Sequence, residues 1–99
     1  MSILDQNLGF REITTELLKS LGFKEALGSF MSDGIRYYPF DLFIKFQQYG
    51  VDKFHHIRYI PHESKVIVKE NADYWSCKKE YTIQVASFDD ICVIVKQYN

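Results

Sequence analysis

Apolar residues near the start of the chain recur with the period of a helix. Over residues 9–21 they occupy one face, at Phe10, Ile13, Leu17, Leu18 and Leu21. Gly22 then offers the left-handed conformation that commonly ends a helix, and Phe23 offers the hydrophobic contact that accompanies it. The pattern predicts an amphipathic helix over residues 9–21.

Between residues 23 and 86 the apolar period changes to two, which is typical of strands that are covered on one face only. The pattern predicts strands over residues 40–47, 54–60, 65–69 and 80–85. Turn-forming residues lie at positions 32–34, 49–52, 61–64 and 70–73. We therefore expect an antiparallel meander of about five strands.

The last segment of the chain carries two conflicting patterns. Ser87 precedes Phe88 and two acidic residues, as a helix N-cap does, and the apolar residues that follow it share one helical face. The run from Ile91 to Val95 is rich in β-branched residues, which also suits a buried strand. The cap favours a C-terminal helix over residues 88–98, and a strand remains the alternative.

These elements predict an α+β fold in one domain, residues 1–99. The chain has 99 residues, of which 46% are hydrophobic and 25% are charged. This length suits a single hydrophobic core, and this composition excludes a disordered protein. We expect both helices to cover the same face of the sheet, which leaves the other face toward water or a partner.

Charge, cysteines and the N-terminal residues bear on the compartment. The net charge is −1, and the longest apolar run is far shorter than the roughly 20 residues of a membrane-spanning helix. The first residues lack the basic start and apolar stretch of a secretory signal. Cys77 and Cys92 have no motif spacing and fit reduced thiols, with a disulfide between them as the alternative. We expect a cytoplasmic protein.

Metal and nucleophile chemistry finds weak support. The three histidines, His55, His56 and His62, lie within eight residues, but neighbours on a strand point to opposite faces, so that all three cannot converge on one ion. Either cysteine could pair with a histidine as nucleophile and base, but nothing in the sequence stabilises a thiolate. No metal and no cofactor is predicted.

Catalytic motifs give the same result. Phosphate-binding glycine loops, His-Glu-x-x-His, Gly-x-Ser-x-Gly and Cys-x-x-Cys do not occur in the sequence. Asp52, Glu63 and Lys65 form a loose pattern that resembles the core of metal-dependent restriction-type nucleases, but Glu63 and Lys65 lie at a predicted turn. We expect no enzymatic activity.

Charge is spread unevenly along the chain. Residues 36–69 hold six Lys or Arg and three acidic residues, a balance of +3, whereas the remainder holds six bases and ten acids. Strand alternation directs Phe43, Lys45, Lys65, Ile67 and Lys69 away from the helices, and His56 and Arg58 share that face. Trp75 lies in a loop where an interface anchor is useful. The candidate partner-binding residues are therefore Phe43, Lys45, His56, Arg58, Lys65, Ile67 and Trp75.

Two functions fit a basic and aromatic sheet face. One is a non-enzymatic protein-binding module that docks on a larger partner, because aromatic residues make up 16% of the chain and anchor many interfaces. The other is single-stranded nucleic-acid binding by stacking and phosphate contacts.

A free sheet edge also allows self-association into a homo-oligomer. The short helix that ends Leu-Gly-Phe before an aromatic meander resembles small proteins of bacteria and their phages, and this resemblance implies an inhibitor of a host enzyme.

Overall fold

The computed structural model describes residues 12–26, 30–73 and 76–99. Its elements, in chain order, are α1 (Thr15–Ser20), β1 (Lys24–Glu25), β2 (Phe30–Ser32), β3 (Ile35–Tyr37), β4 (Phe40–Gln48), β5 (Val51–Ile60), the 3₁₀ helix η1 (Pro61–Glu63), β6 (Lys65–Ala72), β7 (Lys79–Gln84) and α2 (Phe88–Lys96). Neither described helix has the length and continuous apolar sequence needed to cross a membrane.

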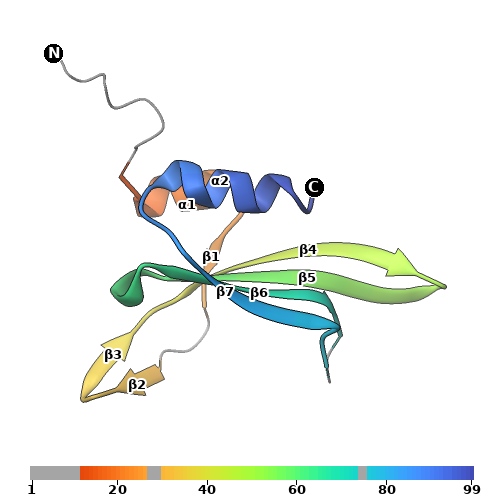
Figure 1. Ribbon diagram of the computed structural model, residues 1–99, viewed down its shortest axis with the longest axis horizontal. Helices are drawn as coiled ribbons and strands as arrows, with labels where there is room; N and C mark the ends of the chain where they lie inside the picture. Colours follow the sequence, from red (N-terminus) through yellow and green to blue (C-terminus); the bar gives the residue numbers. More distant parts are fainter. Residues whose placement is uncertain (1–11, 27–29, 74–75) are drawn as a thin grey trace, which may run out of the picture.

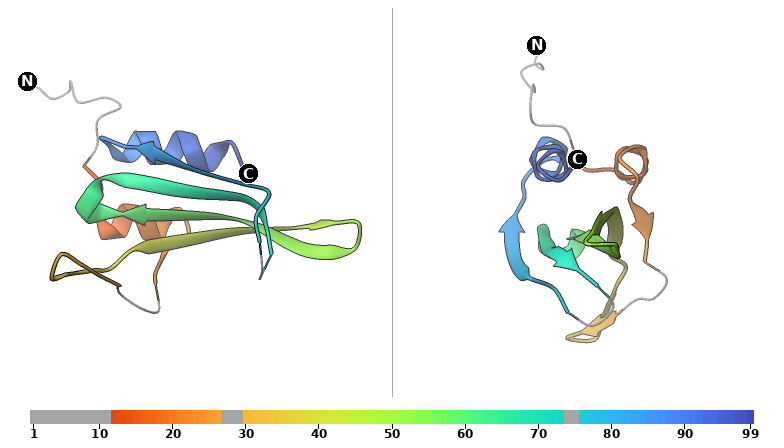
Figure 2. Two further views of the ribbon diagram at one scale, coloured as in Figure 1. Left: turned by 60° about the horizontal axis from the view of Figure 1, so that its bottom comes forward. Right: turned by 90° about the vertical axis from the view of Figure 1, so that its right-hand side faces the viewer.

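Five of the strands form one antiparallel sheet in the order β1-β4-β5-β6-β7, and β2 and β3 form a separate hairpin. The strands β4 to β7 follow each other as a meander. Both helices lie on the same face of this sheet, and the β2–β3 hairpin lies on the opposite side (Figures 1 and 2). The predicted α+β class, with its antiparallel sheet and two terminal helices, is confirmed.

The first helix is shorter than predicted. It begins at Thr15 because Thr14 acts as the N-cap, with its hydroxyl accepting a hydrogen bond from the Leu17 N–H at 3.2 Å. Its end matches the prediction: the Gly22 N–H bonds the Lys19 carbonyl, and the Phe23 N–H bonds the Leu18 carbonyl. Gly22 has φ +102°, so these bonds form a Schellman motif. The predicted start, including Phe10, lies outside the described residues.

The C-terminal segment is a helix and not a strand. The Asp90 carboxylate accepts hydrogen bonds from the Ala86 and Ser87 N–H groups, at 2.7 and 3.2 Å, which ties the first turn of α2 to its N-cap. The helix then buries Phe88, Ile91, Ile94 and Val95 against the sheet. These cap interactions outweigh the β propensity of the Ile91–Val95 run.

The strands differ from the predicted ones at their ends. β4 and β5 extend to a two-residue turn, where Tyr49 and Gly50 have φ +53° and +78°, so the predicted break over residues 49–52 narrows to two residues. The predicted turn over residues 61–64 is a 3₁₀ helix that begins at Pro61, followed by Ser64 at φ +50°. β6 continues through the predicted break to Ala72, because Asn71 at φ +53° forms a bulge.

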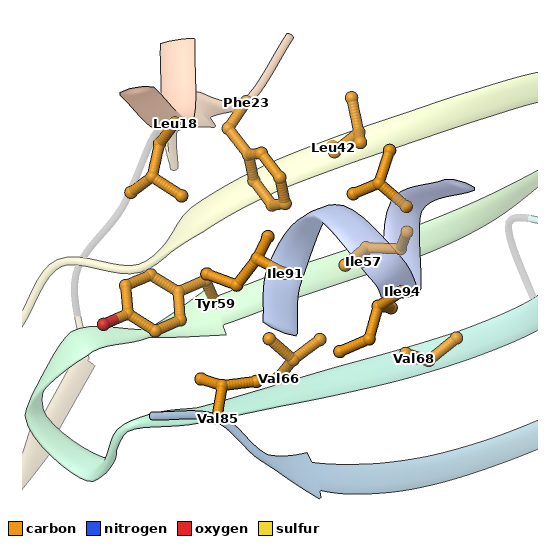
Figure 3. Packing of buried hydrophobic residues seen from close by; sticks show 11 residues of the cluster. Leu18, Phe23, Leu42, Ile57, Tyr59, Val66, Val68, Val85, Ile91 and Ile94 are labelled. Carbon is orange, nitrogen blue, oxygen red and sulfur yellow. The ribbon is translucent and has the colours of Figure 1, made fainter. Parts of the chain in front are cut away.

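The hydrophobic core fills the space between the helix layer and the sheet (Figure 3). Side chains from every layer meet there: Leu18 and Phe23 from the α1 region, Leu42, Ile57, Tyr59, Val66, Val68 and Val85 from the sheet side, and Ile91, Ile94 and Val95 from α2. The core residues of β4, β5 and β6 alternate with side chains on the other face. That second face is called the outer face below.

Candidate functional site

The outer face brings together six of the seven candidate residues. The register places four rows of paired residues across the strands. They are Asp41, Arg58 and Ile67; Phe43, His56 and Lys69; Lys45 and Phe54; and Ile60 and Lys65. Each row alternates with core positions, so Phe43, Lys45, His56, Arg58, Lys65 and Ile67 share this face as predicted. Trp75 lies outside the described residues.

One end of the outer face is closed. Ile60 is 4% exposed and Asp41 is 9% exposed, although both lie on the face opposite to the helices. Figure 1 shows the β2–β3 hairpin on this side of the sheet, beneath the end at which β5 meets η1. The surface that a partner can reach therefore lies toward the β4–β5 turn and not over the whole sheet.

A partly buried ion pair organises the closed end. The Asp41 carboxylate accepts hydrogen bonds from Arg58 Nε at 2.7 Å, from Arg58 Nη2 at 2.9 Å and from His56 Nε2 at 2.9 Å. Burial alone would raise the pKa of Asp41, but the hydrogen bonds from His56 and Arg58 and the charge of Arg58 lower this pKa to about 2. Asp41 is therefore an ionised acceptor that fixes both neighbouring side chains.

Phe43 lies directly beside this network. Its ring stacks on His56, with 4.5 Å between the ring centroids and 8° between the ring planes. The Phe54 ring meets Phe43 edge to face at 5.4 Å. Even so, Phe43 remains 49% exposed. Two aromatic neighbours thus hold a half-exposed aromatic side chain in one orientation.

A groove of about 680 Å³ opens next to Phe43. It lies toward the β4–β5 turn, and the turn after β6 contributes one of its walls. Its lining residues are Phe43, Lys45, Phe46, Gln47, Asp52, Lys53, Phe54 and Asp73. Lys53 and Asp73 form an ion pair at 4.0 Å between two of these walls. An apolar floor with charged rims is typical of a site that binds a peptide or a small apolar group.

The outer face is less basic than its sequence indicates. Arg58 is held by Asp41, and Lys65 by Glu63. Among the described residues of β4, β5 and β6, Lys45 and Lys69 are the outer-face lysines that no carboxylate holds in an ion pair. The sequence balance of +3 over residues 36–69 thus becomes two available positive charges beside Phe43 and His56.

The three histidines do not converge, and the described residues contain no cluster of three or more His, Cys, Asp or Glu that could hold a metal ion. His55 lies on the helix face, as expected from its position next to His56, and its Nδ1 accepts a hydrogen bond from the Asn71 N–H at 3.1 Å. Its ring lies between Phe46 and Tyr98, at 4.7 and 4.8 Å. His55 is therefore part of the packing under the C-terminus.

Glu70 completes that packing. Its carboxylate accepts hydrogen bonds from the hydroxyls of Tyr81 and Tyr98, which also contact each other. The hydrogen bonds from Tyr98 and, to a smaller extent, from Tyr81 lower the pKa of Glu70. The pKa of Tyr98 is raised, mainly by burial and also by its hydrogen bond to Glu70. These contacts fix the end of the chain against β6 and β7.

The other weak groupings fall apart in space. Glu63 pairs with Lys65, but Asp52 bonds Gln47 at the opposite end of β5, roughly 30 Å away for about nine extended residues. The nuclease-like arrangement is therefore not assembled. Cys77 and Cys92 are partly buried free thiols, so they do not form the disulfide that was the alternative.

Some residues of the site were missing from the sequence-based set. Phe54 and Phe46 line the groove; the pairing of Phe54 with Lys45 was an available signal, whereas alternation places Phe46 on the helix face. Tyr49 is 96% exposed at the tip of the β4–β5 hairpin. Asp73 reaches the groove through the turn after β6, and no sequence pattern indicates this.

A scan against protein-family models, a search of curated proteins and a search of solved structures gave no match to this chain. The geometry of the outer face is therefore the basis for the functional argument.

Proposed function

We propose that this chain is a non-enzymatic protein-binding module that docks on a larger partner through the open part of its outer face. The observation that supports this best is Phe43, a half-exposed ring held by His56 and Phe54. Aromatic side chains supply much of the energy of interfaces, and an immobilised one loses little conformational freedom on binding. Phe43 is thus built as an anchor.

The chemistry around Phe43 defines the partner segment. The groove offers the ring of Phe54, next to Phe43, to an apolar side chain. Lys45 lines the groove, and Lys69 stands beside His56 in the register of the sheet. A complementary segment therefore carries an apolar or aromatic residue flanked by carboxylates. Inhibition of an enzyme would follow if that segment borders an active site.

Single-stranded nucleic acid is the second candidate. The stacked pair of Phe43 and His56 offers a flat surface on which a base can stack. The internal ion pairs of Arg58 and Lys65 count against it, because phosphate binding needs available positive charges. Protein docking is the better supported of the two.

A photo-crosslinking residue at position 43 tests the docking proposal in cells of the source. The matched control places the same residue at Val93, which is 59% exposed on α2, on the helix side of the sheet. A crosslinked protein that forms from position 43 and not from position 93 supports docking through the outer face. Crosslinks from both positions, or from position 93 alone, contradict it.

A titration separates the two functions. Fluorescence anisotropy of a labelled oligothymidine, measured at low and moderate salt, reports nucleic-acid binding directly. Tight binding that weakens steeply with salt and falls in Lys45→Ala and Lys69→Ala would reverse the order of the two candidates. The docking proposal expects no saturable binding in this assay.

A further inference from the structure

The two edges of the five-stranded sheet are unequal. β1 forms one edge with only two residues, whereas β7 forms the other with six. β7 pairs with β6 in an unbroken register from Lys79 to Gln84, with no proline and no bulge. Natural sheets commonly protect a free edge with such features, and β7 lacks them.

Alternation of hydrogen bonds shows which backbone groups of β7 are free. The Val85 N–H bonds the Ser64 carbonyl at 3.0 Å, so Ser64 and Val85 form a hydrogen-bonded pair that continues the β6–β7 register. In an antiparallel ladder every second pair is of this kind, which directs the backbone groups of residues 79, 81 and 83 toward β6. The N–H and C=O groups of Glu80, Thr82 and Gln84 therefore point away from the sheet.

We infer that this edge pairs with the β7 edge of a second copy of the chain, antiparallel and centred on Thr82. In this register Thr82 faces the partner's Thr82, and Glu80 faces the partner's Gln84. All of the outward backbone groups of Glu80, Thr82 and Gln84 are then bonded. A register centred on Tyr81 would need the Lys78 N–H, which already bonds the Glu70 carbonyl at 3.0 Å.

Side chains favour the same register. On the helix face Tyr81 lies opposite the partner's Ile83, an aromatic and β-branched pair of the kind that stabilises antiparallel sheets. Both residues are only partly buried at the edge of the core, so pairing removes more of their apolar surface from water. On the outer face two threonines lie opposite each other, and no like charges are directly opposed.

Pairing through β7 is independent of the docking proposal. The edge groups lie on β7, whereas Phe43 and the groove lie toward the β4–β5 turn. Two copies would form one sheet of ten strands, with both helix layers on one side and both outer faces on the other. Loss of the dimer would leave the anchor residues of each copy in place.

Cysteine crosslinking tests both the dimer and its register. With Cys77 and Cys92 changed to Ser, Thr82→Cys is expected to form a disulfide-linked dimer under mild oxidation, because Cα atoms of a directly opposed hydrogen-bonded pair lie about 5.5 Å apart. Glu80→Cys is the matched control. Its two copies are offset by four residues, roughly 13 Å, and are expected to stay unlinked.

Solution measurements on the unaltered chain complete the test. Light scattering is expected to give twice the monomer mass at high concentration. Thr82→Pro removes an outward N–H, so it is expected to raise the dissociation constant of the dimer at least tenfold while the circular dichroism spectrum stays unchanged. Should that variant not fold, amide exchange in the unaltered chain replaces it. Slower exchange of Glu80, Thr82 and Gln84 at high concentration supports the pairing; a monomer at every concentration, or a dimer with these amides unprotected, overturns it.

Discussion

Phe43 and His56 face each other across β4 and β5 with their rings nearly parallel, 4.5 Å apart. His56 is in turn hydrogen-bonded to Asp41, which lies two residues before Phe43 on the same strand. A half-exposed aromatic ring is thus connected through the His56 ring to a partly buried ion pair. The orientation of Phe43 therefore depends on the Asp41 carboxylate, which is bonded to His56 and not to Phe43 itself.

Phe43→Ala is expected to cost about 1–2 kcal/mol of unfolding free energy, since only part of the ring is buried. Phe88→Ala is the matched control, because Phe88 is buried in the core and its truncation is expected to cost about 3–5 kcal/mol. Urea denaturation of both variants measures the two values. Equal losses would show that Phe43 is a core residue and not an anchor.

Asp41→Asn is expected to cost about 2 kcal/mol at pH 7, which corresponds to the lowering of its pKa from 3.8 to about 2. A carboxyl with a lowered folded-state pKa stabilises the fold above its unfolded pKa, and this contribution is lost as pH falls through the folded pKa. The difference in unfolding free energy between the unaltered protein and Asp41→Asn is therefore expected to shrink as the pH falls from about 5 to about 2. Chemical denaturation across this range measures it, with Asp52→Asn as an exposed control.

Tyr49→Asn is expected to stabilise the protein by about 0.5–1 kcal/mol. Tyr49 adopts φ +53° in a two-residue hairpin turn, where asparagine is favoured and a bulky side chain is strained. Thermal unfolding of this variant and of Tyr38→Asn, an exposed tyrosine outside the helices and strands, measures the effect. A loss of stability in Tyr49→Asn would mean that the exposed ring makes contacts worth more than the strain.

Tyr98→Phe is expected to loosen the end of α2. The change removes the hydroxyl that donates to Glu70 and keeps the ring against His55. The loss is expected to be about 1–2 kcal/mol, below the usual value for a hydrogen bond to a charged group, because the Glu70 carboxylate is partly exposed. Amide exchange of residues 96–99 is expected to quicken while exchange of β5 stays unchanged; equal acceleration in both would point to global destabilisation.

Local signals in the sequence predicted several elements and failed at others. Ser87 with Asp90 predicted a helix where the β-branched run from Ile91 to Val95 favoured a strand, and the cap was decisive. Thr14 is also a good N-cap, but the apolar stripe that includes Phe10 and Ile13 extended the predicted helix across it. The capping residues thus predicted where the helices begin better than the apolar pattern did.

The outer face was predicted by alternation alone, because a period of two fixes which residues share a side of a strand. Its charge was predicted less well. Asp41 lies 15 and 17 residues from His56 and Arg58, and only the register of β4 with β5 shows that the three meet. The irregularity at Asn71 had a local signal in the turn-forming residues 70–73, but the reach of Asp73 into the groove had none, so the groove itself could not have been predicted.

Supporting and exposed residues are separate on β4 and β5, and this separation has an evolutionary consequence. Asp41, His56 and Arg58 are bound to one another, so a change in any of them leaves a buried polar group without its partner and weakens the fold. Phe43 and Lys45 extend from this fixed group and can be exchanged at modest cost to the fold. On the docking proposal, changes at these two exposed positions therefore alter the binding preference while the supporting residues stay constant.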